Sequence, residues 1–201
     1  MLIYFTRHGE TEWNKINRIQ GQADSPLSDK GINMAKILKE QAKNINFSKV
    51  YSSDQNRAYN TAKIICPKNN IIKTPLLREI DVGYWSGKNF NDIKKTDAYL
   101  HDLYFHKPEK YNRIDGESFY DLIGRVREFF ETYVYKAKDE NILIVSHGVT
   151  IIAMFTVMEN IEVKDFWKNR VRRNAQFNIA KYDRGKFYII KKAPLNPIDS
   201  L

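Results

Sequence analysis

The sequence predicts an α/β fold with three layers, in which helices cover both faces of a mostly parallel central sheet. Short apolar runs typical of buried strands alternate with segments whose apolar residues recur every three or four positions. Two of the runs, residues 2–5 and 142–145, lead into a His-Gly pair. Because strand–helix alternation needs crossover connections, neighbouring strands should be parallel, with an antiparallel strand expected at the edge.

The first third of the chain is predicted to run strand, helix, strand, helix. Residues 2–5 form the first strand, and the polar, glycine-containing residues 11–27 form a loop over its end. One apolar stripe predicts the next helix, from Ile32, Ala35, Leu38, Ala42 and Ile45. A strand at residues 49–51 precedes a helix at 57–65 that Pro67 ends. The cap of that helix is expected among Ser52, Ser53 and Asp54.

The middle of the chain has a weaker pattern. A short strand is expected at residues 71–72, followed by a loop over residues 76–93 that leads into a helix. Residues 97–116 are rich in aromatic and basic side chains and lack a clean period. We therefore expect residues 86–116 to form an inserted lid, here called the lid segment, within a single domain spanning residues 1–201.

The last third is more regular. Apolar residues between 119 and 133 mark the clearest helix, with Ser118 and Asp121 placed as a capping box. The second His-Gly strand follows, and residues 149–158 form the next helix. Alternating residues from 177 to 191, broken by the turn-forming residues 183–185, predict a β-hairpin.

Composition limits the function classes. A chain of 201 residues with 42% hydrophobic residues can bury one sizeable core. The net charge of +9 should attract anions, from nucleic acid or a membrane surface to small phosphorylated molecules. The basic residues are scattered, however, so solvated surface is the simpler account, and neither nucleic acid nor a membrane is an expected partner. The densest cluster is Arg170, Arg172 and Arg173.

Cysteine use and hydropathy predict a cytoplasmic protein. Cys66 is the single cysteine, so no intramolecular disulfide can form, and no zinc-ligand spacing occurs. No signal-peptide pattern opens the chain, and no apolar run reaches the roughly 18 residues of a membrane helix. Either a monomer or a homodimer is compatible with these features.

The two His-Gly pairs are the first candidates for chemistry. In open α/β sheets the ligand crevice lies beyond the carboxyl ends of the strands, where His8 and His147 would meet. A neutral imidazole is a competent nucleophile, and the arginines Arg7 and Arg57 supply forked donors that match phosphate oxygens. The alternative for each histidine alone is a packed or solvated residue, and for Arg57 a surface cation. The glycines that follow, Gly9 and Gly148, allow close backbone approach.

An ordered set of motifs resembles the histidine phosphatase superfamily, also called the phosphoglycerate mutase-like family. The motifs cover almost the whole chain: Arg7-His8-Gly9-Glu10-Thr11 with Trp13 and Asn14, Gln20-Gly21-Gln22, Pro26-Leu27-Ser28, Tyr51-Ser52-Ser53-Asp54 with Arg57 and Thr61, Leu77-Arg78-Glu79 with Gly83, Trp85 and Gly87, Asp115-Gly116-Glu117-Ser118, and Val145-Ser146-His147-Gly148. Each is weak alone. Their combination in this order is specific.

The resemblance implies a mechanism for a small phosphorylated substrate. His8 would attack phosphorus to form a phosphohistidine, and Glu79 would protonate the leaving oxygen and then activate water. Acting as an acid near neutral pH requires that burial or a neighbouring carboxylate stabilise the protonated form of Glu79. The implied phosphate-binding residues are Arg7, Asn14, Gln20, Gly21, Arg57, His147 and Gly148. No cofactor or metal is expected, and Asn174 is left outside the site because the residues after it depart from the family pattern.

Three activities remain open. The residues that follow Glu79, Ile80-Asp81-Val82-Gly83, lack the Arg/His/Tyr-rich pattern of phosphoglycerate mutases, which favours a histidine acid phosphatase-type phosphoric monoester hydrolase. A cofactor-dependent mutase is the alternative within this chemistry, and a non-catalytic phosphate-binding module the alternative outside it. Three cations of the lid segment are candidates for a second acidic group of the substrate, with solvated surface as the alternative: Lys107, Lys110 and Arg113.

Overall fold

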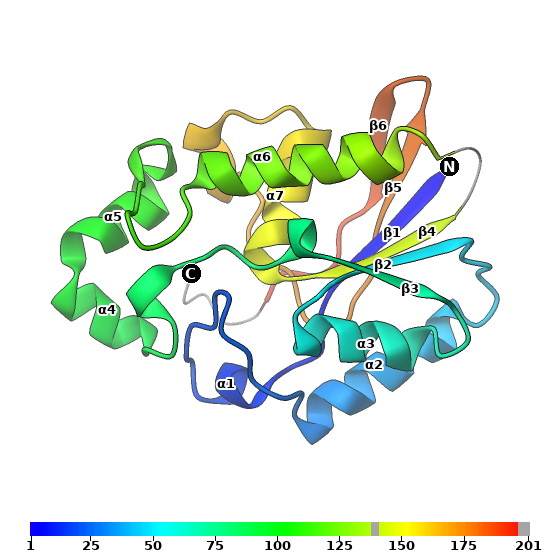
Figure 1. The fold of residues 1–201 in the computed structure, drawn as a ribbon, viewed down its shortest axis with the longest axis horizontal. Coiled ribbons are helices and arrows are strands. Elements are labelled where there is room, and N and C mark those ends of the chain that lie inside the picture. The colour runs from blue at the N-terminus through cyan, green and yellow to red at the C-terminus, as the bar shows by residue number, and fades with distance from the viewer. Residues whose placement is uncertain (138–140, 197–201) are drawn as a thin grey trace.

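The computed structural model describes residues 1–137 and 141–196 and confirms the α/β fold (Figure 1). Six strands form one sheet: β1 (Leu2–Arg7), β2 (Lys49–Ser53), β3 (Ile71–Thr74), β4 (Ile142–Ser146), β5 (Asn178–Asp183) and β6 (Lys186–Lys191). Seven α-helices accompany them: α1 (Glu12–Lys15), α2 (Asp29–Ala42), α3 (Asn56–Ile65), α4 (Phe90–Thr96), α5 (Ala98–His106), α6 (Phe119–Phe129) and α7 (Gly148–Met158).

The sheet order is β3-β2-β4-β1-β5-β6, and the first four of these strands are parallel. The strands β5 and β6 run antiparallel to their neighbours and form the predicted hairpin at one edge. Arg184 and Gly185 link them with φ angles of 49° and 79°, the left-handed conformation that a two-residue hairpin turn requires.

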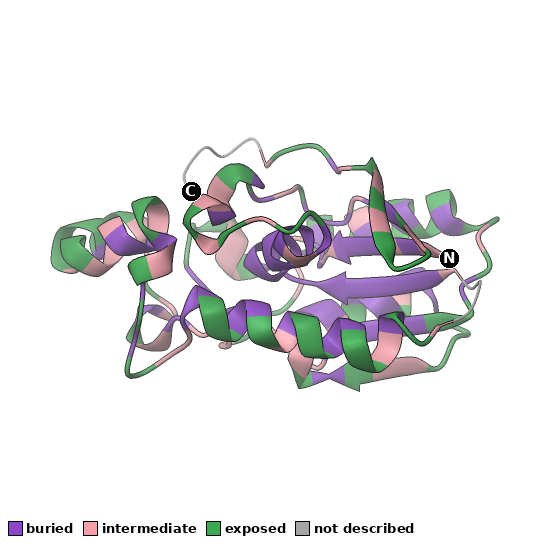
Figure 2. Cartoon of the chain, turned by 90° about the horizontal axis from the view of Figure 1, so that it is seen from above, coloured by how far each residue is buried: buried purple, intermediate pink, exposed green. Residues whose placement is uncertain are grey.

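Helices cover both faces of the sheet. Alternate residues of β4 point to opposite sides: Ile142 and Ile144 join the larger core with α6 and α7, whereas Leu143 and Val145 join the smaller core with α2 and α3. Figure 2 shows buried residues running through the central strands, and exposed residues on the outer sides of the helices. All residues of β4 are buried, as expected for a central strand covered on two faces.

Capping residues in the sequence mark the starts of two predicted helices correctly. Ser28 caps α2, and Ser118 and Asp121 form the predicted capping box of α6. The helix α6 continues as a π-helical turn over Phe130–Val134. Within the described residues, no helix has both the length and the apolar character that crossing a membrane requires.

The structure differs from the sequence predictions in three places. The expected cap of α3 is wrong: Ser52 and Ser53 belong to β2, and the helix starts after Gln55 without a side-chain cap. Within the lid segment, residues 98–106 form the helix α5 although their apolar pattern is not periodic. The loop over residues 11–27 contains one helical turn, α1, closed by a capping box between Thr11 and Asn14.

Candidate functional site

The strand ends bring the two predicted histidines together. The strands β1 and β4 are neighbours, with Arg7 in register with Ser146, and the His8 amide donates to the Ser146 carbonyl at 2.9 Å. The rings of His8 and His147 therefore lie edge to face, with centroids 5.2 Å apart. Both side chains are buried, 2% and 0% exposed. The crevice lies at the carboxyl ends of parallel strands, as the fold class predicts.

The imidazole of His8 has a defined tautomer. Its Nδ1 lies 2.7 Å from the Gly9 carbonyl oxygen, which can only accept a hydrogen bond, so Nδ1 carries the proton and Nε2 keeps a free lone pair. Burial lowers the pKa of His8 well below its ordinary value, and the positive charges of Arg57 and Arg7 lower it further. At neutral pH the ring is therefore neutral, with a lone pair suited to nucleophilic attack.

The backbone around His8 is anchored from distant parts of the chain. The side-chain amide of Asn174 donates a hydrogen bond to the His8 carbonyl at 2.9 Å. The backbone amide of Gly9 donates one to the Thr61 hydroxyl at 3.0 Å. Gly9 also packs tightly: a Cβ there would lie 2.5 Å from the Gly31 carbonyl oxygen. Asn174, left outside the predicted site, thus supports the candidate nucleophile through its backbone.

Two arginines supply positive charge: Arg57 is buried, and Arg7 is half-buried with its Nε and Nη1 covered. Arg57, 1% exposed, uses its two terminal nitrogens on the carbonyls of Gly21 and Ala23, at 2.7 and 2.6 Å, and on Asp24 at 3.0 Å. Within residues 1–137 and 141–196, the Nε of Arg57 and the Nε and Nη1 of Arg7 have no hydrogen-bond partner. Burial lowers the pKa of Arg7 to about 10, which leaves it cationic at neutral pH. Buried donors without a partner are costly, so these atoms indicate where an anion binds.

His147 contributes differently from the arginines. Neither of its ring nitrogens has a partner, and burial lowers its pKa well below the usual value, with Arg57 the next largest cause. It lies against the ring of His8 and is not part of the cavity wall. Gly148, the next residue, does line the cavity, and a Cβ there would lie 3.5 Å from Nε of Arg7. That is an ordinary contact distance, and the tighter neighbour of such a Cβ would be the Val171 side chain at 3.2 Å.

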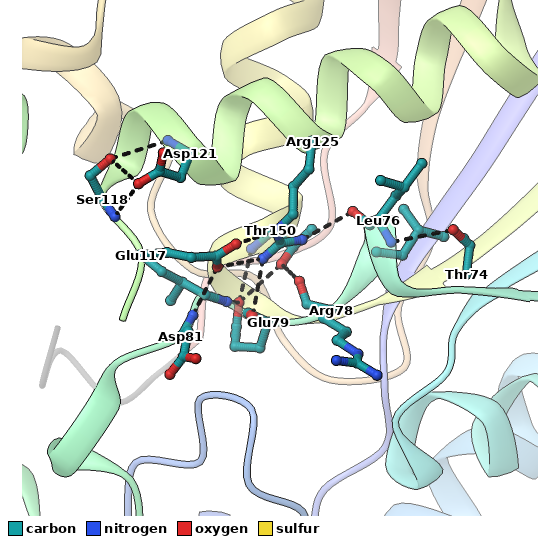
Figure 3. Close-up of polar contacts among 12 residues, drawn as sticks. Thr74, Leu76, Arg78, Glu79, Asp81, Glu117, Ser118, Asp121, Arg125 and Thr150 are labelled. Atoms are coloured by element: carbon teal, nitrogen blue, oxygen red, sulfur yellow. Dashed lines mark hydrogen bonds and ion pairs between the residues drawn. The ribbon is translucent and has the colours of Figure 1, made fainter. Parts of the chain in front are cut away.

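Glu79 lies at the amino end of α7 (Figure 3). Its carboxylate accepts hydrogen bonds from three backbone amides: Val149 at 3.2 Å, Thr150 at 3.1 Å and Ile80 at 3.1 Å. The Thr150 hydroxyl lies 3.1 Å from the same carboxylate, and its one hydrogen is shared with the closer Arg78 carbonyl at 2.7 Å. Among the described residues, donors rather than a second carboxylate contact Glu79, and these bonds fix the position of its carboxylate beside the amino end of α7.

The backbone of Glu79 is held by two residues that the sequence analysis did not identify. Gln55 accepts from the Glu79 amide at 2.9 Å, and Arg125 donates to the Glu79 carbonyl at 3.1 Å. Arg125 also binds both oxygens of Glu117, at 2.7 and 2.9 Å, and the Leu76 carbonyl at 3.0 Å (Figure 3). Because these contacts join separate helices and loops, no local pattern in the sequence indicates them.

A cavity of about 80 Å³ collects the site residues. Of the nine predicted site residues, eight line it: Arg7, His8, Asn14, Gln20, Gly21, Arg57, Glu79 and Gly148. Most of the remaining wall is apolar, with Ile19, Ile80, Val82, Phe90, Val149 and Val171 joined by Tyr104 and Arg18. Phe90 and Tyr104 come from the lid segment.

The three basic residues proposed for a second acidic group do not line this cavity. Arg113 is 7% exposed and is paired with Asp115, with two nitrogen–oxygen distances of 3.0 Å. Its guanidinium also stacks on the rings of Tyr84 and Trp85. Arg113 therefore stabilises the base of the lid segment, and Lys107 pairs with Asp102 on the surface.

Comparison with known proteins agrees with the geometry. The model of the histidine phosphatase superfamily (branch 1) matches residues 3–193. Phosphoserine phosphatase 1 of Hydrogenobacter thermophilus is 30% identical over 193 residues, which cover 94% of this chain and 90% of that protein. A probable phosphoglycerate mutase, GpmB of Proteus mirabilis, is 34% identical over 153 residues, covering 74% and 70% of the two chains.

A solved structure is similar over nearly the full length. The protein YhfR of Bacillus stearothermophilus superposes with a TM-score of 0.91 at 30% identity, covering 97% of this chain and 98% of that one. The relatives thus include both a phosphatase and a probable mutase.

Proposed function

Since the chain belongs to the histidine phosphatase superfamily, we propose that it is a metal-independent phosphomonoesterase that acts through a phosphohistidine on His8. The observation that carries this proposal is the hydrogen bond that Nδ1 of His8 donates to the Gly9 carbonyl oxygen, at 2.7 Å. It leaves Nε2 unprotonated beside buried cationic donors without partners. A module that only binds phosphate needs the cations but not a nucleophile oriented in this way.

The first half-reaction transfers the phosphoryl group to the enzyme. The lone pair of His8 Nε2 attacks phosphorus as the bond between phosphorus and the leaving oxygen breaks, and that oxygen takes a proton from Glu79. The free donors of Arg7 and Arg57 stabilise the charge on the phosphoryl oxygens. His147, against the His8 ring, is proposed to donate to the same oxygens once the anion is bound.

Glu79 must gain a proton before it can act as the acid. We propose that the bound substrate supplies this proton. The second ionisation of a phosphomonoester has a pKa near 6, so its proton is available close to neutral pH. The negative phosphate beside the carboxylate then favours proton uptake by Glu79.

The second half-reaction returns the enzyme to its starting state. Water attacks the phosphorus of the phosphohistidine, the Glu79 carboxylate takes the proton of that water, and the Nε2–phosphorus bond breaks. In a mutase, a hydroxyl of the bound product would take the place of water. The similarity to a probable phosphoglycerate mutase supports mutase activity as the second candidate, whereas the similarity to a phosphoserine phosphatase favours hydrolysis.

The deciding experiment measures phosphate release from a panel of phosphomonoesters in the presence of a metal chelator, with 3-phosphoglycerate isomerisation assayed in parallel. Wild type should release phosphate and form an acid-labile phosphoprotein, and His8→Ala should do neither. His106→Ala is the matched control, because that histidine is 69% exposed and lies outside the cavity. Activity of His8→Ala near the wild-type level would refute the mechanism. Isomerisation without release would identify a mutase.

Glu79→Gln tests the acid. This variant should slow esters with poor leaving groups more than activated aryl esters, because only the former need a proton in the transition state. Equal slowing of both would remove Glu79 from that role.

A further inference from the structure

The cavity wall contains a third arginine, which the mechanism above does not use. We infer that Arg18 binds a second anionic group on the leaving portion of the substrate, an inference that rests on the proposed phosphomonoesterase activity. The enzyme would then select small phosphomonoesters that carry a carboxylate or a second phosphate.

Arg18 differs from the other two arginines of the wall. Arg57 is buried and Arg7 half-buried, and the covered donors that they leave free among the described residues are placed for the phosphoryl group. Arg18 is exposed, and its guanidinium forms no hydrogen bond or ion pair with any other described residue. A guanidinium that lines a site and has no partner keeps its forked donors available to a planar carboxylate or a phosphate.

The size of the cavity places the leaving group near Arg18. The cavity volume is about 80 Å³, and in the proposed mechanism the phosphoryl group takes the part beside the covered donors of Arg7 and Arg57. The rest of the substrate must therefore extend toward the open side of the site, where the exposed Arg18 lies.

The backbone of Arg18 is held in place although its side chain is exposed. Its amide donates to the Trp13 carbonyl at 3.0 Å, and the residue forms a bridge with Asn89. The adjacent Ile19 donates to the Lys88 carbonyl at 3.0 Å and accepts from the Gly87 amide at 2.8 Å. These bonds connect the loop over the site to the start of the lid segment, so binding an anion must order only the side chain.

No other cation of the described wall is left for this task. Beyond the three arginines and His8, the remaining wall residues are neutral or apolar, apart from Glu79. The basic residues Lys107, Lys110 and Arg113 lie outside the wall. A second anion would otherwise meet apolar side chains such as Val82 and Phe90 or uncharged polar ones such as Asn14, neither of which supplies a positive charge.

The test compares three synthetic substrates that share a three-carbon chain: 2-carboxyethyl phosphate, 1,3-propanediol bisphosphate, and the methyl ester of the first, whose leaving portion carries no charge. The variants are Arg18→Gln and Arg18→Lys, with Arg127→Gln as a control that removes one exposed positive charge on α6, away from the cavity. Initial rates give kcat and KM for each pair.

Arg18→Gln should lower kcat/KM for a charged substrate relative to the ester by about tenfold to a hundredfold, as expected for the loss of a charge-assisted hydrogen bond. The change should lie mainly in KM, Arg18→Lys should keep part of the preference, and Arg127→Gln should keep all of it. The substrate that loses the most identifies the second anion as carboxylate or phosphate.

Two results would overturn the inference in different ways. If wild type hydrolyses all three substrates and Arg18→Gln changes them equally or not at all, Arg18 has no role in selection, and the phosphatase mechanism stands. If wild type hydrolyses neither these substrates nor an activated aryl phosphate, the proposed function fails and the role of Arg18 fails with it.

Discussion

The two buried histidines predict that the protein loses stability under mildly acidic conditions. The pKa values of His8 and His147 are lowered well below 6.5 in the folded state, and burial is the main cause for both. In the unfolded chain both return to about 6.5 and bind protons more readily. The free energy of unfolding is therefore unaffected by these two histidines well above pH 6.5, and it decreases as the pH falls below that value because the unfolded chain then binds more protons.

The size of the loss follows from the linkage relation. At pH 5.5, one pH unit below the unfolded pKa, keeping one buried histidine neutral costs about 1–2 kcal/mol, and at pH 7.5 almost nothing. The two together should lower the free energy of unfolding by about 2–3 kcal/mol between pH 7.5 and 5.5. That is a large fraction of the roughly 5–15 kcal/mol that stabilises a typical domain.

Urea denaturation at pH 7.5, 6.5 and 5.5 measures this slope. The double variant His8→Asn/His147→Asn should lose most of it, whereas His106→Asn, at an exposed position, should keep it. Carboxylates with lowered pKa values, such as Asp54, titrate below this range and do not contribute. An unchanged slope in the double variant would show that these histidines are not the proton-linked groups.

Four further substitutions test the packing of the fold and the support of the site. Gly31→Ala should destabilise the fold by about 1–3 kcal/mol in urea denaturation, because the new Cβ would lie 2.0 Å from the Glu10 carbonyl oxygen. Gly124→Ala, whose Cβ would have no neighbour within 4 Å beyond its own helix among the described residues, should instead stabilise α6 by about 1 kcal/mol. Thr150→Val removes the hydroxyl 3.1 Å from Glu79 and should lower kcat for poor leaving groups while phosphate inhibition is unchanged. Asn174→Ala frees the carbonyl of the nucleophile and should lower kcat about tenfold to a hundredfold, with KM within about twofold; an unchanged kcat would contradict that supporting role.

The parts of the fold that depend on neighbouring residues could be predicted from the sequence. The capping box of α6 needs only Ser118 and Asp121, and the hairpin turn needs only a short polar stretch that includes Gly185. The strand order and the path of α5 depend on contacts between distant segments. Helix α5 packs Leu103 and Tyr104 into an aromatic cluster, and its own sequence lacks the period that would indicate this.

The same division holds for the site. Residues of the chemical motifs were predicted, and eight of the nine line one cavity. The residues that position the site were not predicted. Gln55, Arg125 and Asn174 bind the backbone of Glu79 or His8, and other donors and acceptors could do the same in another fold. Arg18 was also missed, since nothing in the sequence separates it from the other scattered cations.

The buried charges of the site explain how one pocket can serve both binding and catalysis. The free donors of Arg7, Arg57 and His147 are each costly to bury without a partner, and in the proposed mechanism phosphate oxygens supply that partner. Part of the binding energy would then come from relieving an unfavourable arrangement that the fold already maintains. Burial, and after it the charges of the same two arginines, lowers the pKa of His8, so the groups proposed to attract the substrate also help to preserve the lone pair proposed to attack it. Removing either arginine would consequently weaken phosphate binding and raise the proton affinity of the nucleophile at the same time.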